Sequence, residues 1–471
     1  MSVMLFIERV YMAIVILYVK LLGKKIYTKY NLEKMKEDLE INKSHPKVLV
    51  QIPMFNEKEV YKISIGAACR LSWPSDRVIV QVLDDSTNLV LKELVEFECL
   101  KWIEMGVNVK YETRNNRNDF QPDEDFLWRT LPYLLENPKL GLAQARWKFV
   151  LTSEEKFEVV SSTAICVGLL TCFPYNGFSL VNADECLMTR LQEMSLDYHF
   201  SVEQEVGSST CSFFGFNGTA GVWQIQTIED AGGWKDRTTV EDMDLAVRAS
   251  LKGWKFIFVG DLGVKNELPS TFKAYRYQQH RWSFGPSNLF RKMTKEIILC
   301  ERVTIWKRLH LIYEFFIVRK IIAHWVTFFF YCIVIPASVL VPEIQLTKPI
   351  AIYIPVPEIQ LTKPIAIYIP ATITLLNAVC TPRSFHLIVF WILFENVMSL
   401  LRTKAAIIGL LEANRVNEWV DPCIGADDGD LHAILRNLQH AIWKQSLLRV
   451  SDTASRGIFH NGVWIYGDIC T

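Results

Sequence analysis

The chain has 471 residues, enough for one large domain with additional elements. Half of its residues are apolar and its mean hydropathy is +0.15, which is high for a wholly soluble protein and predicts membrane segments. Its 51 basic and 51 acidic residues give a formal net charge of zero, which argues against a nucleic-acid binder driven by overall charge. The 11 cysteines form no CxxC pair, so they indicate neither a zinc site nor a disulfide framework.

Residues 1–22 are predicted to form an N-terminal membrane segment, either a truncated transmembrane helix or an interfacial one. The apolar stretch Val10–Leu22 is broken only by Lys20 and is short for a full span. Five lysines follow within the next 14 residues, which favours a cytosolic position for the domain that begins there.

A strand, a helix and a second strand follow in the chain. Apolar runs predict strands at Lys47–Pro53 and Arg77–Leu83, and Val60–Leu71 has helical spacing. This order predicts a doubly wound parallel sheet, in which ligands bind at the carboxyl ends of the strands. Asp84 and Asp85 occupy that kind of place, although they also fit a simple turn that caps the next helix.

Two clusters of polar residues lie between positions 232 and 282. The first is acidic and the second is basic and aromatic; they comprise Asp236, Glu241, Asp242 and Asp244, and then Gln278, Gln279, His280, Arg281 and Trp282. Together they predict one group that takes a proton and another that holds an anion and a flat polar ligand. The alternative is structural: Thr239 and Asp242 form a capping box, and the second cluster is an exposed amphipathic turn.

The motifs TTVEDMD and QQHRW, in this order, resemble those of the processive, inverting family 2 glycosyltransferases. Longer segments, among them NADECLMTRLQEMSLDYHF, FFGFNGTAGVW and ILFENVMSL, resemble plant cellulose synthase-like A proteins, the glucomannan 4-beta-mannosyltransferases. The resemblance covers most of residues 1–420. It implies an α/β fold: a GT-A type doubly wound nucleotide-sugar transferase domain with transmembrane helices at both ends. The implied reaction transfers mannose, with glucose left open, from GDP-mannose or GDP-glucose to a growing β-1,4-mannan or glucomannan.

The resemblance also implies roles for individual residues. The implied catalytic residues are Asp84, Asp85 and Asp242, and the implied substrate-binding residues are Asp119, Gln278, Arg281 and Trp282. Asp242 is the expected base, Arg281 the positive charge that faces the diphosphate, and Trp282 the platform for the sugar. Asp119 is the expected ligand of a divalent metal, Mn²⁺ or Mg²⁺.

The chain departs from this family between Asn118 and Asp119, which are joined directly. The relatives carry a GYKAGAL stretch after NRN and then an Asp-x-Asp motif that binds the metal and the diphosphate. Asp119 resembles the second carboxylate of that motif, and the first is missing together with the loop. Because divalent cations need several oxygen ligands, this loss should weaken donor binding severely.

The expected domain organisation includes two further departures. Residues 151–180 are inserted and are predicted to be a loop without function, and VPEIQLTKPIAIYIP occurs twice in tandem over residues 341–370. The expected parts are the membrane segment 1–22, a glycosyltransferase domain at 23–305, a transmembrane helical region at 306–420, and an atypical tail at 421–471 to which no function is assigned.

The sequence also predicts further membrane helices, a surface helix and a stretch rich in aromatic residues and glycine. Transmembrane helices are expected at Ile321–Val341, Ile365–Val379 and Phe385–Leu401, and the last carries Glu395, which would face protein or the watery path of an emerging polymer. Asn288–Lys307 is predicted to be an amphipathic helix at the membrane surface. The aromatic, glycine-rich stretch 213–223 fits either a surface that stacks on sugars or a tight buried turn.

The expected location is the Golgi membrane, as a multi-pass protein without nucleic-acid partners; a homo- or hetero-oligomer is left open. Two alternative functions remain. One is a β-1,4-glucan synthase of the cellulose synthase-like C type. The other is an inactive membrane paralogue, because the metal and donor loop is missing.

Overall fold

The computed structural model describes residues 1–22, 27, 30–42, 45–54, 61–84, 86, 88–113, 124–148, 186–235, 237–265, 268–269, 271–329, 369, 372–377, 386–411 and 462–466. Three predicted residues, Asp85, Asp119 and Asp236, therefore lie outside the described part of the chain, as does the insertion at 151–180.

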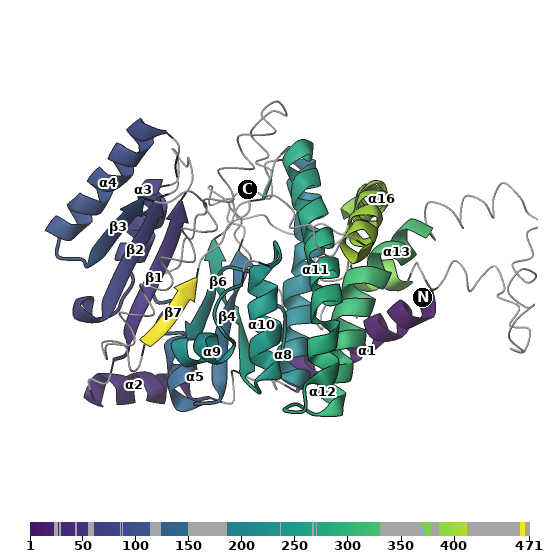
Figure 1. Cartoon of the computed structure of the whole chain (residues 1–471), viewed down its shortest axis with the longest axis horizontal. Coiled ribbons are helices and arrows are strands. Elements are labelled where there is room, and N and C mark those ends of the chain that lie inside the picture. The colour runs from purple at the N-terminus through teal and green to yellow at the C-terminus, as the bar shows by residue number, and fades with distance from the viewer. Residues whose placement is uncertain are drawn as a thin grey trace, which may run out of the picture.

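The described strands form one seven-stranded sheet of order β3-β2-β1-β7-β5-β4-β6 (Figure 1). The strands are β1 (Lys47–Met54), β2 (Val78–Asp84), β3 (Val109–Thr113), β4 (Leu140–Lys148), β5 (Gly221–Gln224), β6 (Lys255–Lys265) and β7 (Gly462–Tyr466). Strand β5 runs antiparallel to both β4 and β7, and the other pairs are parallel. The predicted α/β fold with a doubly wound sheet is confirmed.

The first two strands follow directly from their sequences. Strand β1 lies parallel to β2 in the register Val48–Val78, and the alternate valines of both strands are buried. Between these positions Gln51 donates to Gln81 at 2.8 Å, and Gln81 donates to Glu112 at 2.9 Å. Apolar residues thus alternate with polar ones that bond to one another across neighbouring strands.

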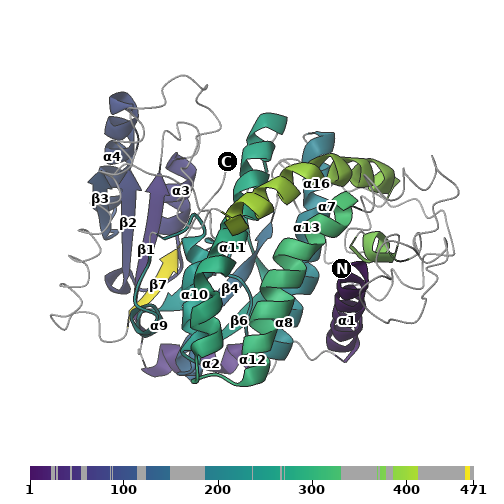
Figure 2. The same ribbon diagram turned by 45° about the vertical axis from the view of Figure 1, so that its right-hand side comes forward.

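Helices cover the sheet and extend beyond one end of it. They are α1 (Ser2–Leu21), α2 (Leu32–Asn42), α3 (Tyr61–Cys69), α4 (Leu89–Glu104), α5 (Leu131–Glu136), α7 (Leu187–Tyr198), α8 (Glu205–Cys211), α9 (Ile225–Asp230), α10 (Glu241–Leu251), α11 (Phe272–Leu299), α12 (Ile305–Leu309), α13 (Ala323–Thr327) and α16 (Ile388–Leu411), with a 3₁₀ turn η2 (Ser75–Arg77) and π-helical segments η3 (His199–Gln204) and η4 (His310–Ile322). Figures 1 and 2 show α4 beside β3 at one end of the molecule and α1, α13 and α16 at the other.

The aromatic stretch 213–223 belongs to the main core. Phe213, Phe216 and Trp223 are at most 1% exposed, and the rings of Phe216 and Trp223 meet edge to face at 5.4 Å. Phe213 packs in the same way against Phe315 of η4 at 5.1 Å. Buried rings cannot stack on a sugar, so for these three the interpretation as a sugar-binding surface is wrong and the buried turn is right.

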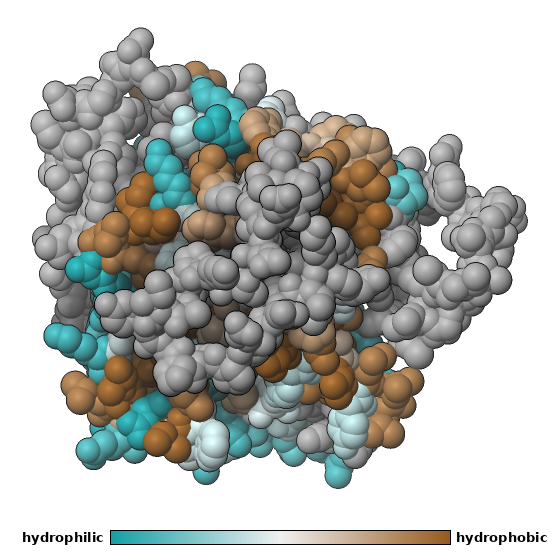
Figure 3. All heavy atoms as spheres, turned by 90° about the vertical axis from the view of Figure 1, so that its right-hand side faces the viewer, coloured by the Kyte–Doolittle hydropathy of each residue, from teal (hydrophilic) through white to brown (hydrophobic). Residues whose placement is uncertain are grey.

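Among the helices that the structure describes, α1 alone has the length and apolarity of a membrane span. It begins earlier than the predicted Val10–Leu22 and carries exposed apolar side chains such as Ile7 and Ile14. Helix α16 extends past the expected Phe385–Leu401 and also exposes apolar residues. Figure 3 views the molecule from the end where these two helices lie and shows apolar patches on it. The segments predicted at 321–341 and 365–379 lie partly outside the described residues.

Part of the tail is a strand of the sheet. Strand β7 pairs in parallel with β1, with Leu49 beside Trp464, and in antiparallel with β5, with Val222 beside Ile465. The sequence alone assigned the tail no function and predicted no strand in it. A strand is needed there because β1 and β5 would otherwise leave unpaired backbone groups inside the sheet.

Candidate active site

Helix α10 places Asp242 in its first turn. The helix begins at Glu241 after Val240, which provides no side-chain cap, so the capping-box interpretation is wrong. Asp242 is partly buried, and its Oδ1 accepts a hydrogen bond from the backbone N–H of Met243 at 2.6 Å. The side chain is thus held at the positive end of the helix without serving as its cap.

The surroundings of Asp242 tune its acidity. Burial raises the pKa of Asp242 to about 6, although the hydrogen bond from Met243 and the positive charge of Arg281 act in the opposite direction. A carboxylate with this pKa is ionised at neutral pH and is still basic enough to take up a proton. These are the properties of a general base.

The neighbouring Asp244 has a structural role. It is completely buried, and its two oxygens accept hydrogen bonds from Arg237 Nε at 3.0 Å and Arg248 Nε at 2.9 Å. A buried carboxylate paired on both sides is not available to a substrate, so the acidic cluster divides into a base and an anchor for α10.

The QQHRW motif lies within one long helix, α11. Thr271 caps this helix by accepting the N–H of Ala274, and the helix then continues to Leu299. The expected exposed turn and much of the separate amphipathic helix are therefore a single element. Gln278 is buried, and Trp282 is partly buried and packs against the main core. Arg281 is partly exposed.

A close contact between α11 and the start of α10 brings the two predicted motifs together. A Cβ atom on Gly285 would lie 2.5 Å from Cγ1 of Val240 and 3.1 Å from Oγ1 of Thr239, so only glycine permits this approach. Val240 immediately precedes α10, and Gly285 lies one helical turn beyond Arg281. Asp242 and Arg281 consequently act on each other electrostatically.

Asp84 ends β2 at the carboxyl edge of the sheet and is completely buried. Its Oδ1 accepts the N–H of Ser86 at 2.9 Å, and its Oδ2 accepts the hydroxyl of Tyr111 at 2.8 Å. The first bond is the turn that the structural alternative predicted, whereas the following helix is capped by Asn88. Asp84 thus orders the edge where ligands bind in such sheets.

Replacing Tyr111 with Phe should lower the free energy of unfolding by about 1–3 kcal/mol, because Oδ2 of the buried Asp84 loses its donor. Thermal unfolding measures this change, and Tyr313→Phe at a more exposed tyrosine is the matched control. Equal stability of the Tyr111 variant and the control would show that the hydroxyl does not hold Asp84.

The described residues do not form a divalent metal site. Within them, no group of three or more His, Cys, Asp or Glu side chains is placed to hold an ion. Asp84 directs both oxygens to protein donors, so it does not fit a metal ligand in this arrangement. The expected ligand, Asp119, lies outside the described part of the chain.

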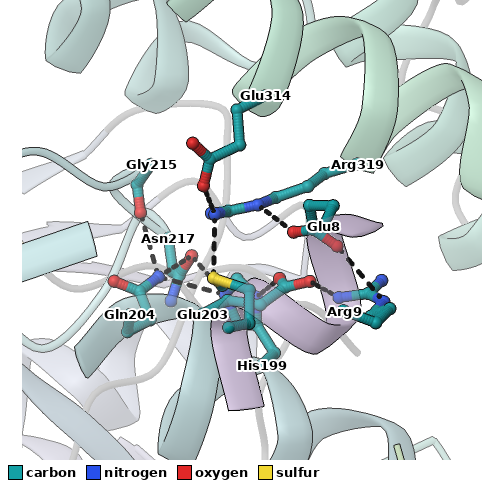
Figure 4. Close-up of polar contacts among 10 residues, drawn as sticks. Glu8, Arg9, His199, Glu203, Gln204, Gly215, Asn217, Glu314 and Arg319 are labelled. Atoms are coloured by element: carbon teal, nitrogen blue, oxygen red, sulfur yellow. Dashed lines mark hydrogen bonds and ion pairs between the residues drawn. The ribbon is translucent and has the colours of Figure 1, made fainter. Parts of the chain in front are cut away.

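A polar network beside the site was not predicted from the sequence. Glu203 of η3 accepts a hydrogen bond from Arg9 of α1 at 2.9 Å and contacts His199 at 2.8 Å, while Arg319 of η4 pairs with Glu8 (Figure 4). Burial raises the pKa of Glu203, but its hydrogen bond with His199 and the charge of Arg9 outweigh this and hold the pKa well below its usual range. The network fastens α1 to the catalytic domain.

Lys320 is a second feature that the sequence analysis missed. Its positive charge acts both on the candidate base Asp242 and on Glu203 of the polar network. In the sequence Lys320 stands beside an apolar stretch and fits a membrane-flanking charge equally well. Only the packing of η4 against the domain distinguishes these two roles.

Comparisons with known proteins identify the family of this chain. Residues 177–356 match the family described as glycosyl transferase family group 2. The chain is 68% identical over 447 residues to glucomannan 4-beta-mannosyltransferase 1 of Cyamopsis tetragonoloba, covering 89% of this chain and 76% of that relative. It is 59% identical over 448 residues to glucomannan 4-beta-mannosyltransferase 9 of Arabidopsis thaliana, covering 89% and 75%.

Among solved structures, the chain is similar to the mannosyltransferase PcManGT from Pyrobaculum calidifontis, determined in complex with GDP-Man and Mn²⁺. That likeness has 11% identity and a TM-score of 0.40, and it covers 87% of this chain and 99% of the other; it is too weak to carry an argument about the site. The assignment rests on the long relatives. On their identity and coverage, the chain belongs to the glucomannan 4-beta-mannosyltransferases, hexosyltransferases of glycosyl transferase family group 2.

Proposed function

We propose that this chain transfers mannose, and also glucose, from the GDP-sugar to the 4-hydroxyl group of a growing β-1,4-mannan or glucomannan, with inversion and processively. The observation that carries the proposal is the position of Asp242, a carboxylate with a pKa of about 6, beside the motif helix α11. The names of the long relatives support the donor and acceptor classes.

In the proposed reaction, Asp242 accepts the proton of the acceptor 4-hydroxyl. The oxygen attacks the anomeric carbon of the sugar from the face opposite the diphosphate, and the bond to GDP breaks with inversion. Arg281 supplies positive charge against the departing diphosphate. Trp282 and Gln278 on the same helix hold the acceptor sugar in line, which removes much of the entropic part of the barrier.

The ion and the membrane setting are further parts of the proposal. A divalent cation, Mn²⁺ or Mg²⁺, would neutralise charge on the diphosphate when bound, with Asp119 as its proposed ligand. Asp84 and Asp85 are proposed to order the donor end of the site. The apolar helix α1 supports membrane association, and a multi-pass position in the Golgi membrane is the proposed location.

Donor assays test this function. Membranes that contain the chain should incorporate label from GDP-mannose and GDP-glucose into a polymer that β-mannanase degrades, and label from UDP-glucose should not enter it. Membranes without the chain are the control. Incorporation from UDP-glucose into a β-1,4-glucan would contradict the proposal and favour the glucan synthase alternative.

A repaired chain distinguishes the proposed function from the inactive paralogue. The direct junction of Asn118 and Asp119 favours weak donor binding. Restoring the missing loop at this junction should therefore raise incorporation from GDP-mannose, whereas removing residues 151–180 alone should not. Restored activity after removal of the insertion alone would show that Asp119 and its neighbours suffice for the donor.

A further inference from the structure

Helix α16 packs tightly on α11, the helix of the QQHRW motif. A Cβ atom on Gly409 would lie 2.5 Å from the backbone oxygen of Phe284, so the two backbones nearly touch at one end of the contact. Near the other end the rings of Tyr275 and Phe394 stack at 5.1 Å. Figure 2 shows α16 crossing α11. The contact therefore extends along the motif itself.

Arg402 of α16 binds this face of α11 through two partners and is held by a third on α16 itself. It is buried, its Nε donates to Oε1 of Gln279 at 2.8 Å, and its Nη2 donates to the hydroxyl of Tyr275 at 2.9 Å. Glu395 of α16, two helical turns earlier, forms an ion pair with it. Gln279, the second residue of QQHRW, is thus occupied by protein and not by a sugar.

Glu395 is held as firmly as Arg402. Its Oε1 accepts a hydrogen bond from Ser195 Oγ at 3.1 Å, and Ser195 in turn accepts one from Trp391 Nε1 at 3.0 Å. The expected watery path for a polymer at Glu395 is not what these contacts show, because the carboxylate faces protein partners. Its charge instead fixes the guanidinium that reaches α11.

The helical geometry of α11 connects this contact to the substrate-binding residues. Tyr275 and Gln279 lie four residues apart and so share the face that Arg402 holds. Gln278 and Trp282 are also four residues apart and lie together on an adjacent face. Any rotation of α11 about its axis therefore moves both substrate-binding side chains at once.

We propose that Arg402 is a positioning residue, which sets the rotation of α11 and thereby the places of Gln278 and Trp282 for the acceptor sugar. The proposal rests on the function proposed above. A side-chain tip lies about 6 Å from a helix axis, so a rotation of about 10° moves it by about 1 Å. A displacement of that size can cost ~10²-fold in rate.

The planar fork of arginine suits this role better than lysine does. One guanidinium reaches an amide oxygen, a phenol and a carboxylate in fixed directions. Arg402→Lys retains the charge but loses these fixed directions. The turnover of Arg402→Lys should therefore lie between that of a variant without the charge and that of the unaltered chain.

The main variant is Arg402→Met combined with Glu395→Met, because removing both charges avoids an unpaired buried ion. In the full chain, kcat with GDP-mannose should fall by ~10- to 100-fold, while KM for GDP-mannose changes less than about twofold. Tyr275→Phe removes only one hydrogen bond and serves as a second, milder variant. It should lower kcat in the same direction.

Arg291→Met is the matched control. Arg291 also joins α11 to α16, by donating to the backbone oxygen of Leu410 at 2.6 Å, but it lies well beyond the motif. If the Arg402 contact only stabilised the packing of α16 on α11, the control and the double variant should lose activity to the same extent. Normal kcat in the double variant, or an equal loss in Arg291→Met, would overturn the proposal.

Hydrogen exchange separates failure of this proposal from failure of the proposed function. If the unaltered chain transferred no mannose, the proposed function would be contradicted. The exchange of backbone amides would still test whether Arg402 positions α11. In the double variant, amides at 275–283 should exchange faster and those at 291–299 should not. Unchanged exchange at 275–283 would overturn the positioning role whatever the donor proves to be.

Discussion

Replacing Asp242 with Asn should lower polymer formation by at least ~10²-fold, the lower range for the loss of general acid–base assistance. Asn has the same shape and retains an oxygen for the N–H of Met243, so the first turn of α10 should persist. The experiment uses a chain with the missing loop restored between Asn118 and Asp119 and measures incorporation from labelled GDP-mannose. Binding of GDP-mannose should change little.

The pH dependence follows from the same group. Since the pKa of Asp242 is about 6, the base is lost as pH falls through that value, and kcat/KM should fall with it. The residual activity of Asp242→Asn should lack this acidic limb. Glu241→Gln, at the adjacent carboxylate of the same turn, is the matched control and should keep both the limb and near-normal turnover.

Stability should change in the opposite direction from activity. The folded state raises the pKa of Asp242 from 3.8, so it favours the protonated form, and stability is lost as pH rises from about 4 to about 6. Asp242→Asn should therefore have a higher Tm than the unaltered chain at pH 8, and the difference should vanish below about pH 4. Near-normal turnover together with an unchanged Tm would exclude Asp242 as the base.

The sequence predicted those parts of the fold that depend on local patterns. Strands β1 and β2 and helix α3 follow from apolar runs and helical spacing, and they lie within two residues of their predicted bounds. Two motifs and their order led to the expectation that Asp242 and Arg281 serve one reaction, and the structure brings their charges within reach of each other. The glycine that permits it, Gly285, lies beyond both motifs and gave no separate signal.

The rest depends on partners that local patterns do not identify. The sequence left open whether Glu395 faces protein or a watery path, and its hydrogen bond with Ser195 requires α7 and α16 to meet. Similarly, the aromatic residues of 213–223 could serve a ligand or a core, and only the packing of Phe213 on Phe315 decides this. Contacts between residues that are far apart in the chain produce no periodic pattern in the sequence.

Strand β7 is the largest such case, and interrupting it should destabilise the sheet between β1 and β5. Both neighbours of β7 are strands, so the residues from Val463 to Tyr466 each belong to two backbone ladders. Proline has no N–H to donate and is not tolerated in a central strand. Ile465→Pro should therefore cost at least about 1–3 kcal/mol for the unpaired group, and more if the strand leaves the sheet.

The result to measure is local. Ile465→Pro should speed amide exchange in β1 and β5, the two partners of β7. It should leave β3, which is separated from β7 by β1 and β2, much less affected. Ile465→Val, which retains the N–H and the branched side chain, is the matched control and should leave all three strands protected. If a chain ending at residue 461 protected β1 and β5 as well as the full chain does, the sheet would hold without its last strand. We expect the shortened chain to lose protection in β1. Without β7, the backbone groups of β1 on that side would be unpaired, and β1 would become an edge strand inside the molecule.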